Sequence, residues 1–310
     1  RVLLTIGGST NGIVHIAAIA GRLGIEIDLD RFDALGNDTP VLVDLKPTGQ
    51  FYMDDLHKAG GMAPILRELK PLLNLDCMTV TGRTLGEEID DMPAAFPQSV
   101  VRSINSPIHS GGGIAFLRGN LAGDGAIIQQ SACTPELLIH EGPAVVFDNL
   151  ADLAERIDAP DLEVTKDSVL ILRNAGPKGA PGMPEAGYLP IPKKLAQQGV
   201  KDMVRISDCR MSGTAFGTII LHAEPEAAIG GPLAFVETGD IIRLDVPRRT
   251  LSMDVSDDEI ARRKSLWTPP ATVEAERGYK KLYMDHVTQA GEGCDFDFLS
   301  KRPFTAKTPD

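Results

Sequence analysis

Aromatic residues and basic charge are both scarce in this chain of 310 residues. Aromatic residues make up 5% of it, against 43% hydrophobic residues in all. The core therefore has to consist mainly of Ile, Leu, Val and Ala. The 31 Lys and Arg residues are outnumbered by 43 Asp and Glu residues, which gives a formal net charge of −12. Because a nucleic-acid-binding surface needs clustered basic residues to displace counterions, this balance argues against a nucleic-acid partner.

Long apolar runs and clustered cysteines are also missing. No segment approaches the roughly 18 apolar residues that a membrane-spanning helix needs, and the first thirty residues lack the pattern of a secretory signal. The four cysteines, Cys77, Cys133, Cys209 and Cys294, form no C-x-x-C pair and no compact disulfide framework. A soluble protein in a reducing, cytoplasmic environment, with no membrane partner, is therefore expected.

Glycine and proline are plentiful, with 31 and 22 residues, and they indicate many tight turns rather than a helical bundle. The chain begins with an apolar run over residues 2–6 that is typical of a buried strand. A glycine turn over residues 7–11 and an apolar helical stretch over residues 13–23 follow. This order of strand, turn and helix is typical of α/β proteins. Because Arg1 stands directly before an apolar run, we expect an N-terminal portion of the natural protein to precede it.

The rest of the first hundred residues predicts short elements. They are a helix capped by Asp28 that ends near Leu35 at Gly36 and Asn37, a strand over residues 41–45, an amphipathic helix over residues 62–73, and a helix opened by a capping box of Thr84 and Glu87.

Short β-type runs become frequent beyond Pro97. Nine runs with turn residues between them predict a barrel or a curled sheet with a few helices packed outside it. The runs cover residues 113–117, 126–130, 144–147, 169–172, 203–206, 218–222, 233–236, 241–246 and 250–255. Helices are expected over residues 149–157, 193–198, 257–266 and 274–287. A boundary near residues 95–108 predicts one domain over residues 1–100 and a second over residues 101–310.

Three familiar nucleotide and metal motifs are incomplete. Residues 7–12 have the glycine spacing of a P-loop, but Ile13 and Val14 stand where Lys and Ser or Thr are required. The glycines at 111–113 are not followed by the third glycine of a dinucleotide-binding turn. His140 is followed by Glu but lacks the second His of a zincin. Nucleoside triphosphate, dinucleotide and zincin sites are therefore excluded.

Ser9 and Thr10 lie in the glycine turn that opens the helical stretch. Backbone N–H groups at a helix start, together with these hydroxyls, could hold a carboxylate or a phosphate. Plain helix capping explains the same residues equally simply.

Two loops after predicted strands carry polar groups. Residues 176–185 hold three glycines and three prolines and end in Glu185, which is either part of a solvated turn or a hard oxygen ligand for Mg²⁺. Residues 208–214 place Ser212 beside a glycine, but the glycines of a serine-hydrolase elbow are absent. This segment is either a polar turn or a catalytic one. Cys209 and the six histidines are predicted to be structural residues.

Five blocks occur in a characteristic order along the chain, at residues 6–11, 135–142, 176–185, 207–218 and 293–299. They resemble the dihydroxy-acid and sugar-acid dehydratase family, which includes the branched-chain biosynthetic dehydratase, phosphogluconate dehydratase, and the arabinonate- and xylonate-type dehydratases. Residues 174–177 and 183–187 are similar to the sugar-acid branch.

The resemblance implies an α/β fold with two parts. These are the end of the family's N-terminal α/β domain over residues 1–100 and a C-terminal β-barrel-like domain, flanked by helices, over residues 101–310. It also implies a hydro-lyase that converts an aldonate to a 2-keto-3-deoxy acid with the help of Mg²⁺ and an iron–sulfur cluster. In this family Ser212 would be the base, acting as an alkoxide, and Glu185 a Mg²⁺ ligand. Thr214, Ser9 and Thr10 would contact the substrate.

The family's cluster-binding cysteines and its other Mg²⁺ ligands, among them a carbamylated lysine, match positions upstream of Arg1. These 310 residues alone are therefore expected to bind no cluster and to be inactive. The family also implies a homodimer or homotetramer. Two other interpretations stay open: the dihydroxy-acid dehydratase of branched-chain amino-acid biosynthesis, and a non-catalytic barrel that serves as a binding module.

Overall fold

The computed structural model describes residues 1–46, 48–183, 189–211, 216–271 and 275–301. Within these ranges the α-helices are α1 (Val2–Thr5), α2 (Asn11–Arg22), α3 (Leu29–Asn37), α4 (Met53–Lys58), α5 (Met62–Leu69), α6 (Leu85–Asp90), α7 (Leu150–Arg156), α8 (Lys193–Ala196), α9 (Asp257–Leu266) and α10 (Gly278–His286). The strands are β1 (Ala115–Gly119), β2 (Ala122–Ile128), β3 (Ile139–Phe147), β4 (Val169–Leu172), β5 (Arg205–Ser207), β6 (Ile219–Glu224), β7 (Ile241–Asp245) and β8 (Thr250–Met253).

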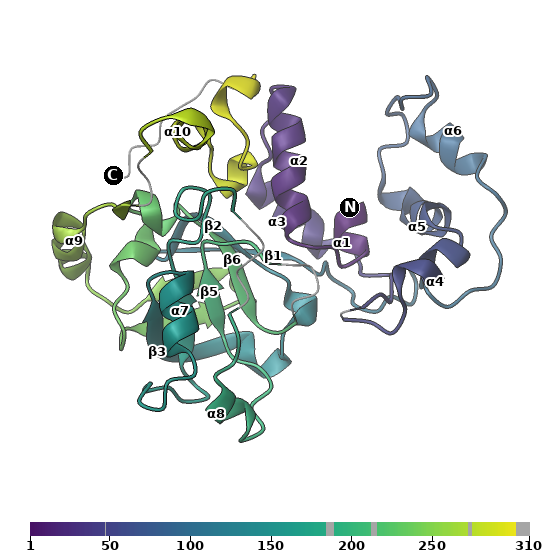
Figure 1. The fold of residues 1–310 in the computed structure, drawn as a ribbon. Coiled ribbons are helices and arrows are strands. Elements are labelled where there is room, and N and C mark those ends of the chain that lie inside the picture. The colour runs from purple at the N-terminus through teal and green to yellow at the C-terminus, as the bar shows by residue number, and fades with distance from the viewer. Residues whose placement is uncertain (47, 184–188, 212–215, 272–274, 302–310) are drawn as a thin grey trace.

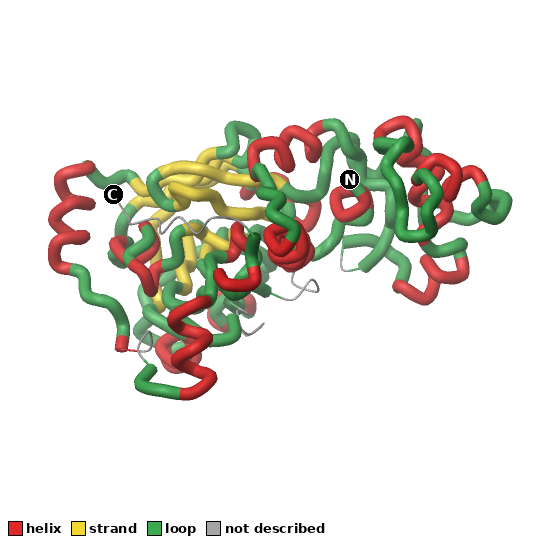
Figure 2. The backbone as a smooth tube through the Cα atoms, turned by 90° about the horizontal axis from the view of Figure 1, so that it is seen from above, coloured by secondary structure: helices red, strands yellow, loops and turns green. Residues whose placement is uncertain are grey.

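The strands form a closed barrel in the order β1-β2-β6-β5-β4-β3-β7-β8. Strands β3, β4, β5 and β6 pair in parallel, whereas β2 is antiparallel to β6 and β7 is antiparallel to β3. Figures 1 and 2 show the barrel at one end of the molecule and helices α4 to α6 at the other, with α1 to α3 between them. The predicted α/β fold with a helix-flanked barrel is confirmed.

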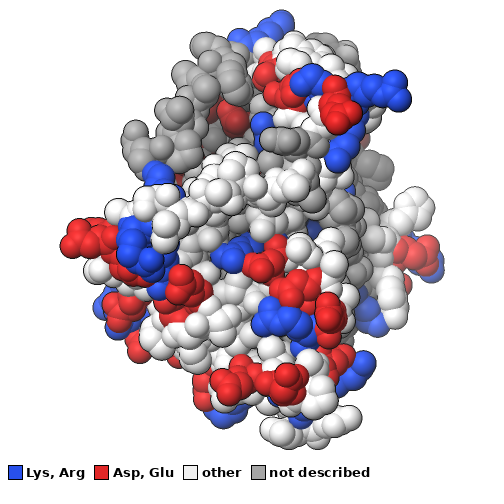
Figure 3. All heavy atoms as spheres, turned by 60° about the vertical axis from the view of Figure 1, so that its left-hand side comes forward, with Lys and Arg blue, Asp and Glu red and all other residues white. Residues whose placement is uncertain are grey.

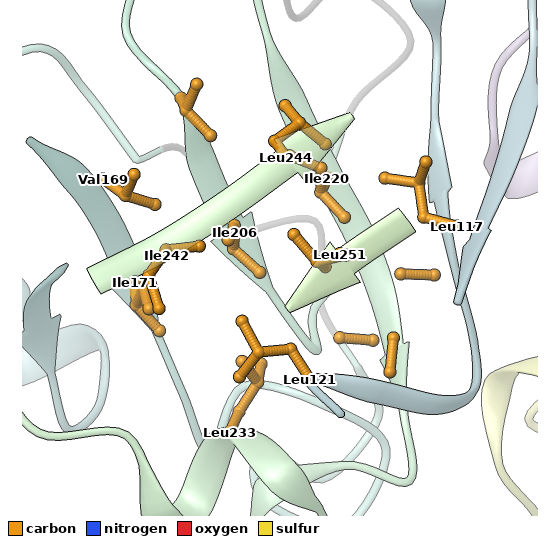
Figure 4. Packing of buried hydrophobic residues seen from close by; sticks show 14 of the residues in the cluster. Leu117, Leu121, Val169, Ile171, Ile206, Ile220, Leu233, Ile242, Leu244 and Leu251 are labelled. Atoms are coloured by element: carbon orange, nitrogen blue, oxygen red, sulfur yellow. The ribbon is translucent and has the colours of Figure 1, made fainter. Parts of the chain in front are cut away.

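Alternating side chains of the parallel strands fill two different cores. In β4, Val169 and Ile171 point into the barrel (Figure 4). They belong there to one apolar cluster that includes residues of all seven other strands. Leu170 and Leu172 point outward and pack with Leu153 of α7. A strand buried on both faces reads as a continuous apolar run, which explains why residues 169–172 are recognisable in the sequence.

Eight of the nine predicted β-type runs overlap strands. The ninth, over residues 233–236, is wrong, because Pro232–Phe235 forms the 3₁₀ helix η5. Pro232 has no N–H to offer a strand partner and suits the first turn of a helix. Leu233 and Phe235 are nonetheless buried, so the apolar pattern reports burial rather than strand geometry. All four helices predicted beyond residue 100 are present, and α9 has the predicted bounds.

Two strands predicted near the N-terminus are wrong. Residues 2–6 form one helical turn instead, in which the N–H of Thr5 donates to Arg1 O at 2.9 Å and that of Ile6 to Val2 O at 3.0 Å. Residues 41–45 make only isolated bridges, including Val41 with His109 and Val43 with Val101. Short apolar runs cannot be assigned to strand or helix by periodicity alone. The helical turn at residues 2–6 still meets the bridged segment, since Thr5 O accepts the N–H of Leu42 at 3.0 Å.

Helix α3 starts as predicted but ends later. The Asp28 carboxylate accepts the N–H groups of Asp30 and Arg31 at 2.9 and 3.1 Å. The predicted stop near Leu35 is wrong, because the helix continues through Gly36 to Asn37. The carbonyl of Gly36 accepts the N–H of Gly112 at 2.6 Å, and a Cβ at Gly112 would lie 2.7 Å from that carbonyl oxygen, so the two segments pack closely. The predicted helix at 13–23 and the predicted capping box at 84–87 are confirmed by α2 and α6.

Charged side chains are interleaved by sign on the face shown in Figure 3. Arg263 of α9, for example, pairs with Glu259 of the same helix at 2.9 Å and with Asp240 at 2.5 Å. Because Asp240 directly precedes β7, the second pair ties the helix to the barrel. In the described ranges no helix is both long enough and apolar enough to span a bilayer.

Candidate active site

Polar residues gather where the parallel strands β4, β5 and β6 end. Asn174 comes two residues after β4, Asp208 directly after β5, and Glu226 two residues after β6. In α/β sheets ligands bind beyond the carboxyl ends of parallel strands, because polar loops converge there on a rigid frame. The loops that hold the predicted residues Glu185 and Ser212 start at β4 and β5, so both begin at this edge.

Asp208 connects all three strand ends. Its carboxylate accepts the backbone N–H of Asn174 at 3.1 Å, of Ala175 at 2.9 Å and of Ala227 at 2.9 Å. Burial raises the pKa of Asp208, while these three hydrogen bonds act in the opposite direction. The side chain thus serves as a fixed acceptor between the loops after β4 and β6.

Glu226 is a second buried carboxylate at the same edge. It accepts the backbone N–H groups of Lys178 and Gly179 at 3.0 Å and the side-chain amide of Gln289 at 2.8 Å. A Cβ at Gly176 would lie 2.6 Å from Glu226 Oε2, so a glycine is needed there for the loop to approach. Burial, together with the charge of Asp208, raises the pKa of Glu226 to about 7.

The two loops that start at β4 and β5 are tied together at both ends of their segments outside the described residues. Where these segments begin, Arg210 Nε donates to the carbonyl of Met183 at 2.5 Å. Where they end, the Arg205 guanidinium donates to the carbonyls of Leu189 at 3.2 Å and Phe216 at 3.1 Å. The segments 184–188 and 212–215 are therefore bracketed by shared cationic side chains.

His222 sits at a β-bulge in β6. Between the pairs Gly125↔Glu224 and Ile127↔Leu221, β6 has one residue more than β2. His222 lies in this bulge with a φ of 53°, in the left-handed region, and its backbone N–H donates to Cys209 O at 3.1 Å. Bulges change the direction of a strand and often lie beside functional sites.

The imidazole of His222 is buried, and among the described residues neither of its ring nitrogens has a hydrogen-bond partner. Burial and the charge of Arg210 lower the pKa of His222 to about 4. A neutral imidazole still carries one N–H donor, and leaving it unpaired costs about 1–3 kcal/mol. Within the described part of the chain, the imidazole of His222 thus has no hydrogen bond that would explain its burial.

Three of the five predicted site residues, Glu185, Ser212 and Thr214, lie outside the described residues. Their flanking residues meet at the carboxyl edge of the parallel strands, as set out above. The other two lie at the start of α2. Ser9 Oγ accepts the N–H of Asn11 at 3.2 Å, while Thr10 is the N-cap residue and makes no side-chain capping bond.

Helix α2 reaches the same neighbourhood through its first turns. Val14 packs with Met183, Ala290 and Cys294 in one small apolar cluster. Since Met183 is the last described residue before the segment that holds Glu185, the start of α2 and the loop after β4 are neighbours. The structure therefore brings the glycine turn and the candidate loops to one region.

A resident metal or iron–sulfur cluster does not fit the described residues by themselves. No three His, Cys, Asp or Glu side chains in that part of the chain lie close enough to hold a metal ion. Cys209 is buried, and burial raises its pKa to about 12, which suits the predicted packing role and not a thiolate ligand. The carboxylates of Asp208 and Glu226 are occupied by N–H donors.

Several residues of this edge are missed by sequence reasoning, namely His222, Glu226 and Gln289. The available signal for Glu226 is its place two residues after an apolar strand, similar to the signal that singles out residues 208–214. Gln289 is more than sixty residues away from Glu226, so the pairing depends on the tertiary fold.

The buried Glu226 and His222 predict opposite pH dependences of stability. Between pH 4.5 and 7 folded Glu226 keeps a proton that the unfolded chain has lost, so the free energy of unfolding falls as pH rises. Between pH 4 and 6.5 unfolded His222 binds a proton that the folded protein excludes, so the free energy of unfolding rises with pH. Urea unfolding from pH 5 to 6.5 should show a steeper rise for Glu226→Gln and a shallower one for His222→Gln, each by up to about 1.4 kcal/mol per pH unit. Identical slopes in wild type and both variants would contradict the assignment.

Two family models match the chain. The C-terminal model described as dihydroxy-acid/6-phosphogluconate dehydratase matches residues 99–294, and the corresponding N-terminal model matches residues 1–88. The chain belongs to the dihydroxy-acid/6-phosphogluconate dehydratase family. The resemblance inferred from the five sequence blocks is thereby confirmed.

Curated relatives in this dehydratase family include enzymes named for sugar acids. The chain is 52% identical over 301 residues to 6-deoxy-6-sulfo-D-gluconate dehydratase of Pseudomonas putida and 48% identical over 307 residues to L-arabonate dehydratase of Azospirillum brasilense. It is 42% identical over 296 residues to dihydroxy-acid dehydratase of Caldanaerobacter subterraneus subsp. tengcongensis. These matches cover 94–96% of this chain but 52% of each relative, so the chain spans about half the length of the curated relatives it matches.

Proposed function

We propose that the complete protein is a cytoplasmic hydro-lyase that dehydrates a sugar acid to a 2-keto-3-deoxy acid. The observation that carries the proposal is the bracketing of segments 184–188 and 212–215 by Arg210 and Arg205. Because these bonds hold the ends of both segments together, they support a shared site for Glu185 and Ser212. Ser212 would remove the C2 proton of the acid, and Thr214, Ser9 and Thr10 would contact the substrate.

A serine hydroxyl has a pKa far above 7, so it acts as a base only beside strong positive charge. We include Mg²⁺ in the proposal for this reason, with Glu185 as one oxygen ligand, and an iron–sulfur cluster whose cysteines belong to a part of the protein outside this chain. When bound, these groups would supply Lewis-acid chemistry at the substrate's oxygens. We also propose a homodimer or homotetramer.

The choice of a sugar acid rests on the relatives. Those named for sugar acids reach 52% and 48% identity, whereas the dihydroxy-acid dehydratase above reaches 42%. That last value keeps branched-chain dihydroxy-acid dehydration as the second candidate.

A substrate panel tests the proposal. The complete protein, supplied with Mg²⁺ and with iron and sulfide, is incubated with L-arabinonate, 6-deoxy-6-sulfo-D-gluconate and 2,3-dihydroxyisovalerate, and keto-acid release is measured. We expect the highest kcat/KM on one of the two sugar acids. Faster turnover of dihydroxyisovalerate would select the second candidate. A colourless protein without turnover would support the non-catalytic binding module. The 310-residue chain alone is expected to be inactive, and turnover by it would refute that expectation.

A further inference from the structure

The loop over residues 174–183, which leads from β4 toward Glu185, has little structure of its own. Two backbone bonds lie within it, Ala180 N to Gly176 O at 2.9 Å and Met183 N to Ala180 O at 2.8 Å. Its other anchors come from side chains of distant segments, including Asp208, Glu226 and Tyr283, whose hydroxyl donates to Pro177 O at 3.0 Å. The position of the loop therefore depends on residues outside it.

Glu226 and Gln289 form a reciprocal pair under this loop. Gln289 Nε2 donates to Glu226 Oε1 at 2.8 Å, and the backbone N–H of Glu226 donates to Gln289 Oε1 at 3.0 Å. The remaining acceptor positions of the Glu226 carboxylate take the N–H groups of Lys178 and Gly179. One buried carboxylate thus joins the loop to the C-terminal segment.

The segment that carries Gln289 is itself firmly placed. Gly291 N donates to Glu224 Oε1 at 2.9 Å, and Arg22 of α2 holds both carboxylate oxygens of Asp295, at 2.7 and 2.9 Å. A Cβ at Gly293 would lie 2.4 Å from Ala18 N, so the segment contacts α2 directly. Gln289 therefore has a fixed position from which it can hold the Glu226 side chain.

We infer that Glu226 and Gln289 are a positioning pair, which fixes the amides of Lys178 and Gly179 and so sets where the loop leading to Glu185 stands relative to the turn leading to Ser212. Neither residue needs to touch the substrate for this role. The inference concerns the same site as the proposed function, and only its activity measurements rest on that function.

Because each hydrogen bond in the pair has a fixed direction, exchanging the two side chains in a double variant tests the pair. Glu226→Gln sets two side-chain amides against each other, and because Gln289 must also accept the backbone N–H of Glu226, no flip repairs every bond. Gln289→Glu sets two carboxylates against each other. In the double variant Glu226→Gln/Gln289→Glu the amide donates to the carboxylate in the opposite direction, and the new carboxylate at position 289 can still accept the backbone N–H of residue 226. The amide oxygen of the new side chain at position 226, in the place of Oε2, can accept the N–H groups of both Lys178 and Gly179, so only the second contact of the Lys178 N–H, to Oε1, lacks a counterpart.

Hydrogen exchange of the chain provides the readout that needs no activity. Each single variant should raise the exchange rates of the Lys178 and Gly179 amides at least about tenfold, and the double variant should restore them to within a few-fold of wild type. Ser168→Ala is the matched control, since it removes a side-chain bond to a backbone amide at the other end of β4, where Ser168 Oγ accepts Thr165 N at 3.0 Å. It should lower Tm without changing exchange at 178 and 179.

Kinetics of the complete protein provide the second readout. Each single variant should lower kcat about tenfold or more with a smaller change in KM, because misplacement of a catalytic loop acts on the transition state. The double variant should recover most of kcat, and Ser168→Ala should leave kcat unchanged.

Single variants whose amides at 178 and 179 exchange at the wild-type rate would overturn the inference. A double variant whose exchange rates and kcat depart from wild type by as much as the two single effects combined would overturn it too. Should both single variants fail to fold, a double variant that also fails to fold overturns it as well. Absence of turnover in the wild type would refute the proposed function and leave the exchange result to decide the pair.

Discussion

Ser212→Ala in the complete protein is expected to lower kcat for its sugar acid by about 10²–10⁴-fold, the usual effect of removing a positioned acid–base group. The expectation follows from the proposed role of Ser212 as the base at C2. Because the hydroxyl acts on the proton in the transition state, KM should change much less than kcat. The measurement is steady-state release of the 2-keto-3-deoxy acid over a range of substrate concentrations.

A matched serine on the surface serves as the control for this substitution. Ser256 is the N-cap of α9, where its Oγ accepts the N–H of Glu259 at 3.3 Å. Ser256→Ala should cost about 1 kcal/mol of stability and leave kcat at the wild-type value. Equal kcat for wild type and Ser212→Ala, in protein that turns over its substrate and is supplied with Mg²⁺, iron and sulfide, would remove Ser212 from the reaction.

The barrel could be predicted from the sequence because its strands have a local signal. A run such as residues 169–172 is apolar at every position, since one face of the strand lines the barrel and the other packs under helices. The same signal fails at residues 2–6 and 233–236. Those runs are also apolar, yet residues 2–6 form a helical turn and Pro232 opens the 3₁₀ helix η5. Burial can be read from composition, whereas pairing cannot.

The candidate site was predictable only in part, for a related reason. The loops after β4 and β5 are visible as glycine-rich and polar segments that follow strands. The anchors that hold them are not visible, because Glu226 and Gln289 become partners only when the C-terminal segment folds back onto the barrel. The sequence predicts a structural role for His222, because nothing local distinguishes a histidine at a bulge from one in a regular strand.

Asp202→Ala is expected to lower the free energy of unfolding by about 3–5 kcal/mol, the cost of leaving a buried partner charge uncompensated. Asp202 and Arg205 are 2.9 Å apart and almost fully buried. The Asp202 carboxylate also accepts the backbone N–H of Thr218 at 2.9 Å and its hydroxyl at 2.8 Å. Burial alone would raise the pKa of Asp202, but these bonds and Arg205 hold it below its ordinary value, so the carboxylate stays charged at neutral pH.

The same substitution should act on the candidate site as well as on stability. Arg205 holds the carbonyls of Leu189 and Phe216, the first described residues after the two segments that contain Glu185 and Ser212. Without Asp202 the guanidinium loses the carboxylate that pairs with it at 2.9 Å. In the complete protein kcat should therefore fall even at temperatures where the variant remains folded.

A surface ion pair provides the comparison for Asp202→Ala. Arg248 lies 3.3 Å from Asp245 in the β7–β8 hairpin, and its side chain is 83% exposed. Because solvent screens such a pair, Arg248→Ala should change the free energy of unfolding by less than about 1 kcal/mol and leave kcat unaltered. Urea unfolding of the wild type, Asp202→Ala and Arg248→Ala at pH 7 measures the change in the free energy of unfolding for each variant. If Asp202→Ala proves as mild as Arg248→Ala, the buried pair does not hold the two site segments as described.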